Sequence, residues 1–219
     1  MMKNDQTKQE RLLNEIEAEL KATSYMTGIS HLSFEVLNAF KKVSRHLFVP
    51  YEEESYAYLN RPLPIGEGQT ISQPFIVALM TELLDVQPTD KILEIGTGSG
   101  YQAAILSHLA SEVYTIEIFP SLARQAHDRF KKLGYKNIHT LIGNGGEGWA
   151  EYAPFNKIIV TAAADKIPYT LISQLSKNGI MVIPLGEEGR EQSLTVIHKN
   201  SKGQISQKSV LPVQFVPFQ

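Results

Sequence analysis

Residues 91–100 of the chain read KILEIGTGSG, and this stretch decides the fold. The apolar residues 91–95 predict a buried strand, and a helical pattern covers residues 99–110. In the turn between them, glycines recur at every second position, at Gly96, Gly98 and Gly100. Glycine is needed where the backbone takes an unusual φ angle or where a ligand presses on the main chain. A strand, a glycine turn and a helix therefore predict a ligand site at the end of a parallel strand.

The segments on either side continue this alternation of strand and helix. Further strands are predicted at residues 113–117, 137–142, 157–161 and 180–184, and further helices at residues 73–84, 121–133 and 169–175. Such alternation implies a parallel sheet with helices on both faces, whose strands end along one ligand-binding edge. Two last strands are predicted at residues 193–199 and 213–217. A turn-rich connection joins them, so we expect an antiparallel pair that closes the sheet.

The N-terminal part of the chain lacks this alternation. An amphipathic helix is predicted around an apolar stripe formed by Leu12, Leu13, Ile16 and Leu20. This helix either covers the sheet or contacts a partner. A second helix is predicted at residues 33–43, with Ser33 as its N-cap and with Phe34, Leu37 and Phe40 on one face. Residues 47–68 combine prolines and glycines with aromatic residues, which predicts an ordered loop region rather than a linker.

The composition limits the classes of function. The chain has 219 residues, of which 42% are hydrophobic and 20% charged, as in an ordinary globular protein. Lys and Arg number 21 against 23 Asp and Glu, and the net charge of −2 argues against a general nucleic-acid binder. There is no cysteine and the six histidines show no metal-ligand spacing, so we expect no metal. No segment is apolar enough for a membrane span or a secretory signal, so we expect a cytoplasmic protein.

Glu117 gives the glycine turn an acidic partner. It ends the predicted strand 113–117, where a carboxylate accepts hydrogen bonds from both hydroxyls of a ribose and repels a 2′-phosphate. The glycine spacing is G-x-G-x-G, whereas a dinucleotide site is expected to read G-x-G-x-x-G and to bind a pyrophosphate. The combination indicates a ligand with a free ribose and no pyrophosphate, which S-adenosylmethionine satisfies. NAD, or a turn that binds no ligand, are the alternatives.

Polar residues also stand at two neighbouring positions of the expected binding edge. Glu94 directly precedes the glycine turn, and it either braces that turn or reaches the amino group of the methionine moiety. Asn144 and Gly145 follow the predicted strand 137–142, where an adenine would lie. A plain glycine turn is the alternative interpretation of that segment.

Several longer stretches of the sequence point to one family. They read RHLFVP at residues 45–50, AY at 57–58, PLPIG at 62–66, GQTISQP at 68–74, LEIGTGSGYQ at 93–102, APF at 153–155, IVTAA at 159–163 and FVP at 215–217. Together they closely resemble the protein-L-isoaspartate O-methyltransferases, from about residue 27 to the C-terminus. Many methyltransferases share the glycine turn, whereas the TIS and FVP pieces are much more specific to this family.

The resemblance implies a fold and an activity. The implied fold is a doubly wound, mostly parallel, seven-stranded Rossmann-like α/β sheet with helices on both faces and an antiparallel C-terminal strand pair. We expect residues 1–219 to form a single domain, in which residues 1–72 cover the sheet and carry a substrate segment and residues 73–219 bind the cofactor. The implied reaction moves a methyl group from S-adenosylmethionine, leaving S-adenosylhomocysteine, to the free α-carboxylate of L-isoaspartyl residues. The ester then closes to a succinimide, which lets a damaged chain return to a normal aspartyl linkage.

The resemblance also implies partners and site residues. Isoaspartyl-containing proteins and peptides are the expected partners, without nucleic acid or membrane, and we expect a monomer. Ser72 matches the family's active-site serine, and Thr70 is expected to act beside it. The residues expected to bind the cofactor are Gln69, Thr70, Ile71, Ser72, Glu94, Gly96, Gly98, Gly100, Glu117, Asn144 and Gly145.

The implied chemistry agrees with the residues available. A backbone-like carboxyl group has a pKa of about 3.5, so it is already ionised at neutral pH and needs no general base. It needs alignment, which the hydroxyls of Thr70 and Ser72 are suited to provide. Ser72 also stands directly before the predicted helix 73–84, so a helix N-cap is the alternative role for it.

Four positions depart from the usual residues of the family: Ser44 stands where relatives tend to carry Pro, Gln214 where they tend to carry Arg, and two more have lost an acid. Asn60 and Asn144 stand where relatives tend to carry Asp. The carbonyl of Asn144 still accepts a hydrogen bond from an adenine amino group, but the lost charge predicts cofactor binding weaker by about 1 kcal/mol. Three hypotheses follow: a protein-repair carboxyl methyltransferase, a methyltransferase with another acceptor, and a catalytically weak relative that binds without turnover.

Overall fold

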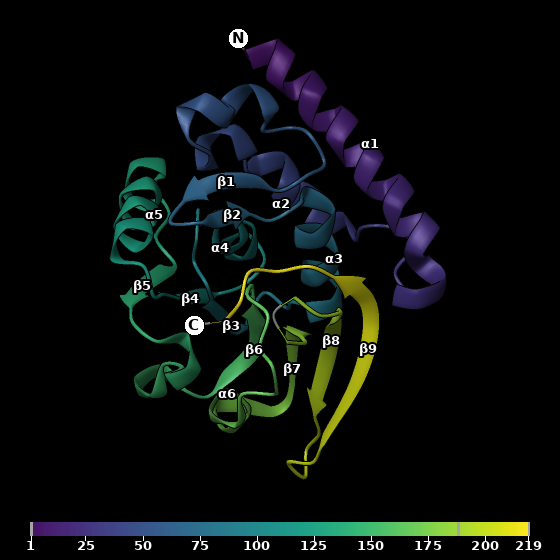
Figure 1. Ribbon diagram of the computed structural model, residues 1–219, viewed down its shortest axis with the longest axis vertical. Coiled ribbons are helices and arrows are strands. Elements are labelled where there is room, and N and C mark those ends of the chain that lie inside the picture. The colour runs from purple at the N-terminus through teal and green to yellow at the C-terminus, as the bar shows by residue number, and fades with distance from the viewer. Residues whose placement is uncertain (1, 188, 219) are drawn as a thin grey trace.

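The computed structural model describes residues 2–187 and 189–218. Met1, Glu188 and Gln219 lie outside the described residues, so the expected domain 1–219 is described without these three residues. Figure 1 shows the helices and strands in their order along the chain. These elements are α1 (Met2–Thr27), α2 (Phe34–Lys42), η1 (Arg45–Phe48), η2 (Tyr51–Tyr56), β1 (Leu63–Gly66), β2 (Gln69–Ile71), α3 (Pro74–Leu84), β3 (Lys91–Ile95), α4 (Tyr101–Ser107), β4 (Glu112–Glu117), α5 (Pro120–Leu133), β5 (Ile138–Ile142), η3 (Gly145–Glu147), η4 (Ala150–Tyr152), β6 (Phe155–Val160), α6 (Tyr169–Gln174), β7 (Leu175–Leu185), β8 (Gln192–Lys199) and β9 (Ile205–Val213).

The main sheet has the predicted, mostly parallel arrangement. Across the described residues it has seven strands in the order β5-β4-β3-β6-β7-β8-β9. Strands β3 to β7 run parallel, and β8 is antiparallel to both β7 and β9. The chain leaves β3 toward β4 and β5 and then returns to β6 on the other side of β3. The switch in direction therefore lies between β3 and β6, which is where such sheets bind ligands.

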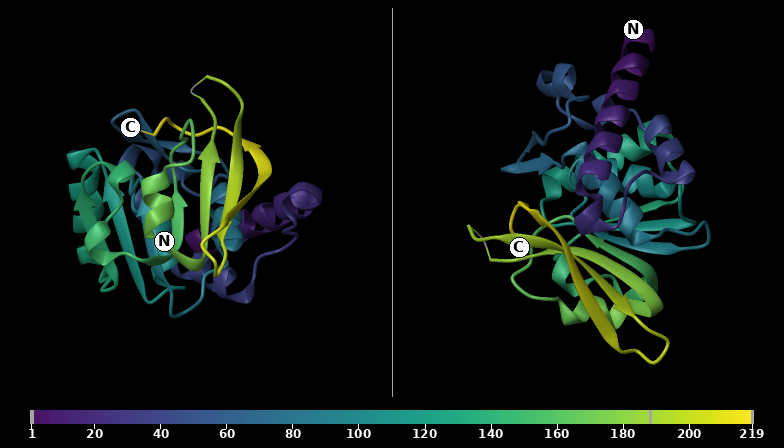
Figure 2. Two further views of the ribbon diagram at one scale, coloured as in Figure 1. Left: turned by 90° about the horizontal axis from the view of Figure 1, so that it is seen from below. Right: turned by 90° about the vertical axis from the view of Figure 1, so that its right-hand side faces the viewer.

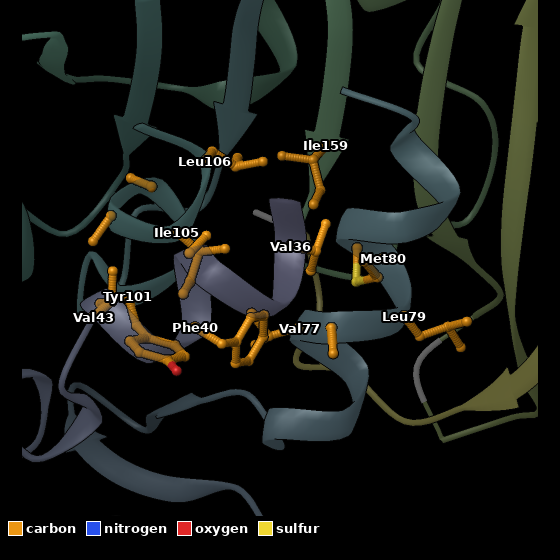
Figure 3. Close-up of a cluster of buried hydrophobic side chains, with 14 of the residues drawn as sticks. Val36, Phe40, Val43, Val77, Leu79, Met80, Tyr101, Ile105, Leu106 and Ile159 are labelled. Carbon is orange, nitrogen blue, oxygen red and sulfur yellow. The ribbon is translucent and has the colours of Figure 1, made fainter. Parts of the chain in front are cut away.

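Helices cover both faces of the sheet, but unequally. Alternate residues of a strand point to opposite faces, so Ile92 belongs to the core shared with α1 to α5, whereas Leu93 belongs to the core shared with α6. Figure 2 shows the thick helical layer on one side of the sheet and the shorter helices on the other. In Figure 3, Val36 and Phe40 of α2 lie between α3 and α4. The rings of Phe40 and Tyr101 meet edge to face, with centroids 6.2 Å apart.

The N-terminal helices confirm most of the prediction. The apolar stripe of α1 is buried, and this helix lies along α3 and the edge strand β9 (Figure 1). Ser33 caps α2, because its hydroxyl accepts a hydrogen bond from the backbone N–H of Val36 at 3.3 Å. The predicted apolar face of α2 is wrong at Phe34, which is 73% exposed. The helix instead turns Val36, Ala39 and Phe40 toward α3 and α4.

The main differences from the prediction lie in three segments, besides β7, which begins at Leu175 and not at residue 180. The last strand is β9 at Ile205–Val213, not residues 213–217, because the turn at residues 200–203 is a tight hairpin and β9 begins just after it. Residues 216–218 instead pair with Ala163 at the carboxyl edge of the sheet. Residues 47–68 contain η2 and part of the β1–β2 hairpin rather than loop alone. Helix α4 begins at Tyr101, later than predicted, because the glycine turn extends to Gly100.

The described helices give no sign of a membrane span. None of them is both long enough and apolar enough to cross a bilayer. Helix α1, although 26 residues long, carries many charged residues outside the buried stripe that packs on α3 and β9.

Candidate active site

A pocket opens at the carboxyl ends of β3, β4 and β6, beside the switch in strand order. Its walls come from the turn after β3, residues 117–119 at the end of β4, residues 161–162 after β6, the segment 69–72 and the C-terminal residues 216–218. The space between these walls is about 800 Å³ when its open mouth is included, and polar groups from several segments converge on it, as in small-ligand sites. The segments that were predicted to share one sheet edge therefore do meet there.

The glycine turn serves both packing and access. Gly100 has φ 84°, and a Cβ there would lie 2.5 Å from the ring of Phe130, so α5 packs directly on this backbone. Gly98 has φ 51° and lines the pocket, where a Cβ would meet only the Ile65 methyl at 3.4 Å. The turn thus presents bare main chain to a ligand at Gly98, while Gly100 holds the turn against the helix layer.

Glu117 lies at the base of the turn. Its side chain is buried, and one carboxylate oxygen accepts from the N–H of Gly98 at 2.7 Å while the other accepts from the N–H of Phe119 at 3.0 Å. A carboxylate offers about four lone-pair sites, so each oxygen keeps one for a further donor. Glu117 is therefore fixed in place and still able to accept from the two hydroxyls of a ribose.

Glu94 is the second buried acid of the pocket. Its Oε2 accepts from the Thr115 hydroxyl, which in turn bonds to Thr97 of the glycine turn, so Glu94 does brace that turn. Burial raises the pKa of Glu94 to about 8; the hydrogen bond from Thr115 lowers the pKa and the charge of Glu117 raises it. Within the described structure, Oε1 of Glu94 is buried without a hydrogen-bond partner. Such an orphaned acceptor in a ligand pocket fits the amino group of a methionine moiety.

The other expected cofactor residues fall into two groups. The residues that line the pocket are Gln69, Thr70, Ile71, Ser72, Glu94, Gly96, Gly98, Glu117 and Gly145. Gly100 and Asn144 are not among the described residues that line the pocket. The Asn144 side chain is exposed, and its Oδ1 accepts from the N–H of Gly146 at 2.8 Å, which caps η3. Asn144 thus shapes the turn that brings Gly145 to the pocket.

A second, wider groove shares a wall with this pocket. Thr70, Ser72, Thr161 and Val216 line both spaces. The Thr161 hydroxyl is engaged, since it donates to the carbonyl of Gly96 at 2.7 Å. The hydroxyls of Thr70 and Ser72 have no hydrogen-bond partner in the part of the chain that the structure describes. Two hydroxyls that can still form a hydrogen bond with a ligand therefore lie where the pocket and the groove meet.

The alternative role of Ser72 as a helix N-cap is wrong. The cap position of α3 is Gln73, whose side chain makes no capping bond. Asn60 supplies the bond instead, because its Oδ1 accepts from the N–H of Phe75 at 3.0 Å. The Asn60 amide also donates to Glu19 of α1 at 2.7 Å. Asn60 therefore anchors α3 and α1 beside the groove, and Ser72 stays available to a ligand.

Sequence reasoning missed several residues of these two spaces, among them Glu19, Thr161 and Phe218. Glu19 had a detectable signal, because it stands between Ile16 and Leu20 at the border of the buried stripe of α1. Thr161 directly follows β6 at the switch. No group of three or more His, Asp or Glu side chains suited to a metal ion occurs among residues 2–187 and 189–218.

This arrangement defines a class of protein. A doubly wound sheet with a glycine turn after β3, an acid at the end of β4 and an unpaired buried acid oxygen fits S-adenosylmethionine, so the fold and the pocket are those of the Rossmann-like methyltransferases that use this cofactor.

Comparison with known proteins gives the family. The chain belongs to the protein-L-isoaspartate(D-aspartate) O-methyltransferase family, whose model matches residues 18–219. It is 52% identical to protein-L-isoaspartate O-methyltransferase 2 of Polaromonas sp. over 94% of this chain and 98% of that protein. It is 53% identical to protein-L-isoaspartate O-methyltransferase of Picosynechococcus sp. over 84% of this chain and 82% of that protein.

Solved structures agree with this assignment. A protein-L-isoaspartate O-methyltransferase superposes with a TM-score of 0.83 at 26% identity, over 95% of this chain and 65% of that chain. A Plasmodium falciparum structure in complex with S-adenosyl-L-homocysteine superposes with a TM-score of 0.77 at 24% identity, over 94% of this chain and 98% of that chain, and has the same fold.

Proposed function

We propose that this chain transfers a methyl group from S-adenosylmethionine to the free α-carboxylate of L-isoaspartyl residues in damaged proteins and peptides. One observation carries the proposal: the cofactor pocket and the wider groove meet at the unpaired hydroxyls of Thr70 and Ser72. The family and the relatives at about 50% identity support the same activity. We refer to the wider groove as the acceptor groove.

The pocket residues would hold the cofactor at three points. Glu117 would accept from the ribose hydroxyls, Glu94 Oε1 from the amino group, and Gly98 would let the main chain approach closely. When bound, S-adenosylmethionine supplies an electrophilic methyl group on a positively charged sulfur. The residues 216–218 form a wall of this pocket and shield it from water on that side.

The acceptor side needs orientation and no proton transfer. Thr70 and Ser72 donate hydrogen bonds to a carboxylate without protonating it, since a hydroxyl remains far less acidic than a carboxyl group. Correct orientation of two reactants lowers a barrier by up to about 7–11 kcal/mol. Two well-placed hydrogen-bond donors therefore suffice to make Thr70 and Ser72 important for the rate of methyl transfer. Thr161, whose hydroxyl is already bonded to Gly96, fixes the shared wall rather than the acceptor.

We infer that residues 1–72 and 73–219 act as one domain. Helix α1, the segment 70–76 and the C-terminal residues 211–216 together line the acceptor groove, and one hydrophobic core contains residues of both parts. The cytoplasmic location, the monomeric state and the lack of nucleic-acid and membrane partners stay predictions from the sequence.

A labelling experiment tests the proposed function. The protein is incubated with S-adenosylmethionine carrying a labelled methyl group and with two peptides that differ only in one aspartyl or isoaspartyl linkage. We expect base-labile label on the isoaspartyl peptide and none on the aspartyl peptide. Equal labelling of both peptides, or cofactor binding without any labelling, contradicts the proposal and favours another acceptor or a binding protein, respectively.

A further inference from the structure

The acceptor groove carries a single charged side chain among the described residues that line it, Glu19 of α1. Apolar side chains, prolines, threonines, a serine and glutamines form the rest of this described lining. Thr23 lies one helical turn after Glu19 and lines the groove as well. The face of α1 between its buried stripe and solvent therefore forms one side of the groove, and Glu19 sets its charge.

Neutral groups hold the Glu19 carboxylate in place. The Asn60 amide donates to Oε2 at 2.7 Å, and the Gln73 amide lies 3.4 Å from the same oxygen. Neither amide carries a charge that could balance the carboxylate. Burial raises the pKa of Glu19, while the hydrogen bonds from Asn60 and Gln73 lower it. The two amides therefore favour a carboxylate that is ionised and fixed in direction.

No cation of the described residues neutralises this carboxylate. The ion pairs that the structure records elsewhere are Lys8 with Asp5, Arg11 with Glu15, His139 with Glu112 and Arg190 with Glu187. A half-buried carboxylate that faces a groove without a counter-ion gains from a cation brought by the ligand. The groove thus has a fixed negative group that no cation of the described residues pairs with.

Glu19 lies close to the expected reaction centre. Its partner Gln73 directly follows Ser72, whose hydroxyl faces the acceptor carboxylate in the proposed function. Two like charges, the acceptor carboxylate and Glu19, then share one groove, and a second acidic group on the acceptor would add to their repulsion. A basic group on the acceptor would instead lie between two carboxylates and be attracted by both.

We propose that Glu19 determines acceptor specificity, by favouring isoaspartyl peptides with a Lys or Arg next to the isoaspartyl residue and disfavouring those with an acidic neighbour. This inference rests on the proposed function. A purely structural role is the competing explanation, since Glu19 also ties α1 to Asn60 and Gln73. A tie between elements would affect all acceptors alike, whereas a charge interaction depends on the acceptor.

The experiment compares three isoaspartyl peptides that differ only in the residue next to the isoaspartyl position: Lys, Gln or Glu. For the wild type we expect kcat/KM to decrease in that order, with the Lys peptide about tenfold better than the Glu peptide, as for partly shielded charge pairs. The difference should lie in KM rather than kcat. In Glu19→Gln the ratio should fall to about twofold, and in Glu19→Lys it should reverse.

Glu10→Gln is the matched control. Glu10 is an exposed residue of the same helix, so this variant removes the same charge from α1 away from the groove and should keep the wild-type ratio. A second readout needs no variant: the wild-type preference for Lys over Glu should shrink as salt is raised from about 0.01 M to 1 M, because screening weakens the pair.

The outcomes separate the two proposals. If the wild type methylates the Gln peptide but treats the Lys and Glu peptides equally, the inference on Glu19 is overturned and the proposed function stands. The same holds if Glu19→Gln lowers kcat/KM equally for all three peptides, because Glu19 then only holds α1 against Asn60 and Gln73 and does not select the acceptor. If the wild type methylates none of the three peptides, the proposed function fails and the inference fails with it.

Discussion

The cofactor pocket and the acceptor groove adjoin each other, yet the chain builds them in different ways. The largest group of pocket residues comes from the ends of strands β3 and β4 and from the turns that follow β3, β4 and β6, within one regular alternation of strand and helix. The acceptor groove combines α1, the segment 70–76 and residues 211–216, which lie far apart in the sequence. Substitutions in the two regions should therefore have different effects. Those in the cofactor pocket should change the affinity for S-adenosylmethionine, and those in the acceptor groove should change the kinetics with the acceptor.

The largest effect is expected at Glu117, in the cofactor pocket. In Glu117→Gln the ribose would lose a charged acceptor, and one of the N–H donors of Gly98 and Phe119 would face an amide nitrogen. Hydrogen bonds to charged groups contribute about 1.5–3 kcal/mol, so we expect the Kd for S-adenosylmethionine to rise about 100-fold. Calorimetric titration measures this change.

Glu112→Gln is the control for that titration. Glu112 is the first residue of the same strand, at the end away from the pocket, and forms an exposed pair with His139. This variant should bind S-adenosylmethionine as the wild type does. A comparable loss of affinity in both variants would mean that strand β4 is merely destabilised, and the separation of the two regions would not hold.

The next effect is expected at Ser72, where the two regions meet. Ser72→Ala removes a donor to the acceptor carboxylate, and we expect kcat on an isoaspartyl peptide to fall about 30-fold, or roughly 2 kcal/mol. The Kd for S-adenosylmethionine should stay within about twofold of the wild type, and Ser206→Ala on the exposed face of β9 should change neither quantity. Unchanged turnover in Ser72→Ala would remove this serine from the acceptor site.

Glu94 lies in the cofactor pocket, and its protonation should make the free energy of unfolding depend on pH. Burial raises its pKa from 4.5 to about 8, so the folded protein keeps a proton that the unfolded chain releases. This contribution to stability is complete below pH 4.5 and is lost as the pH rises through about 8. Without cofactor, we expect the wild type and Glu94→Gln to unfold with similar free energy at pH 5, and the wild type to be less stable by about 4 kcal/mol at pH 9.

Denaturant titrations of both proteins across this pH range measure the difference. Other buried acids with raised pKa values, such as Glu82 and Glu19, titrate in both proteins and cancel in the comparison. A difference that does not depend on pH would show that Glu94 is already ionised in the folded protein at pH 5.

The smallest effect is expected at Asn144. In Asn144→Asp the carboxylate would still cap η3 through the N–H of Gly146 and would add a charged acceptor beside Gly145. We expect S-adenosylmethionine to bind about fivefold more tightly, which corresponds to about 1 kcal/mol. Unchanged affinity by calorimetry would mean that Asn144 only shapes its turn, as its exposed side chain permits.

The sequence predicted the cofactor pocket better than the acceptor groove for a physical reason. The glycine turn and Glu117 follow strands whose apolar runs are visible locally, and parallel strands bring their ends to one edge without further information. The sheet, its antiparallel side and Ser33 as the cap of α2 were predicted for the same reason, because each depends on a local pattern. Nine of the expected pocket residues lie together there.

The groove could not be derived in this way. The contact of Glu19 with Asn60 and Gln73 depends on how α1 lies against α3, which no local pattern specifies. The true cap of α3 comes from Asn60, a distant residue, so the assignment of Ser72 as that cap was wrong. Strand β9 was misplaced because its first five residues are exposed and show no apolar alternation.

The most direct test of the account is a crystal structure of the protein with S-adenosylhomocysteine and an isoaspartyl peptide. We expect the ribose hydroxyls at Glu117, the amino group at Glu94 Oε1, and the free α-carboxylate of the isoaspartyl residue within hydrogen-bond distance of the Thr70 and Ser72 hydroxyls. A nucleoside bound away from the turn after β3, or a peptide carboxylate that lies away from both hydroxyls, would contradict the account.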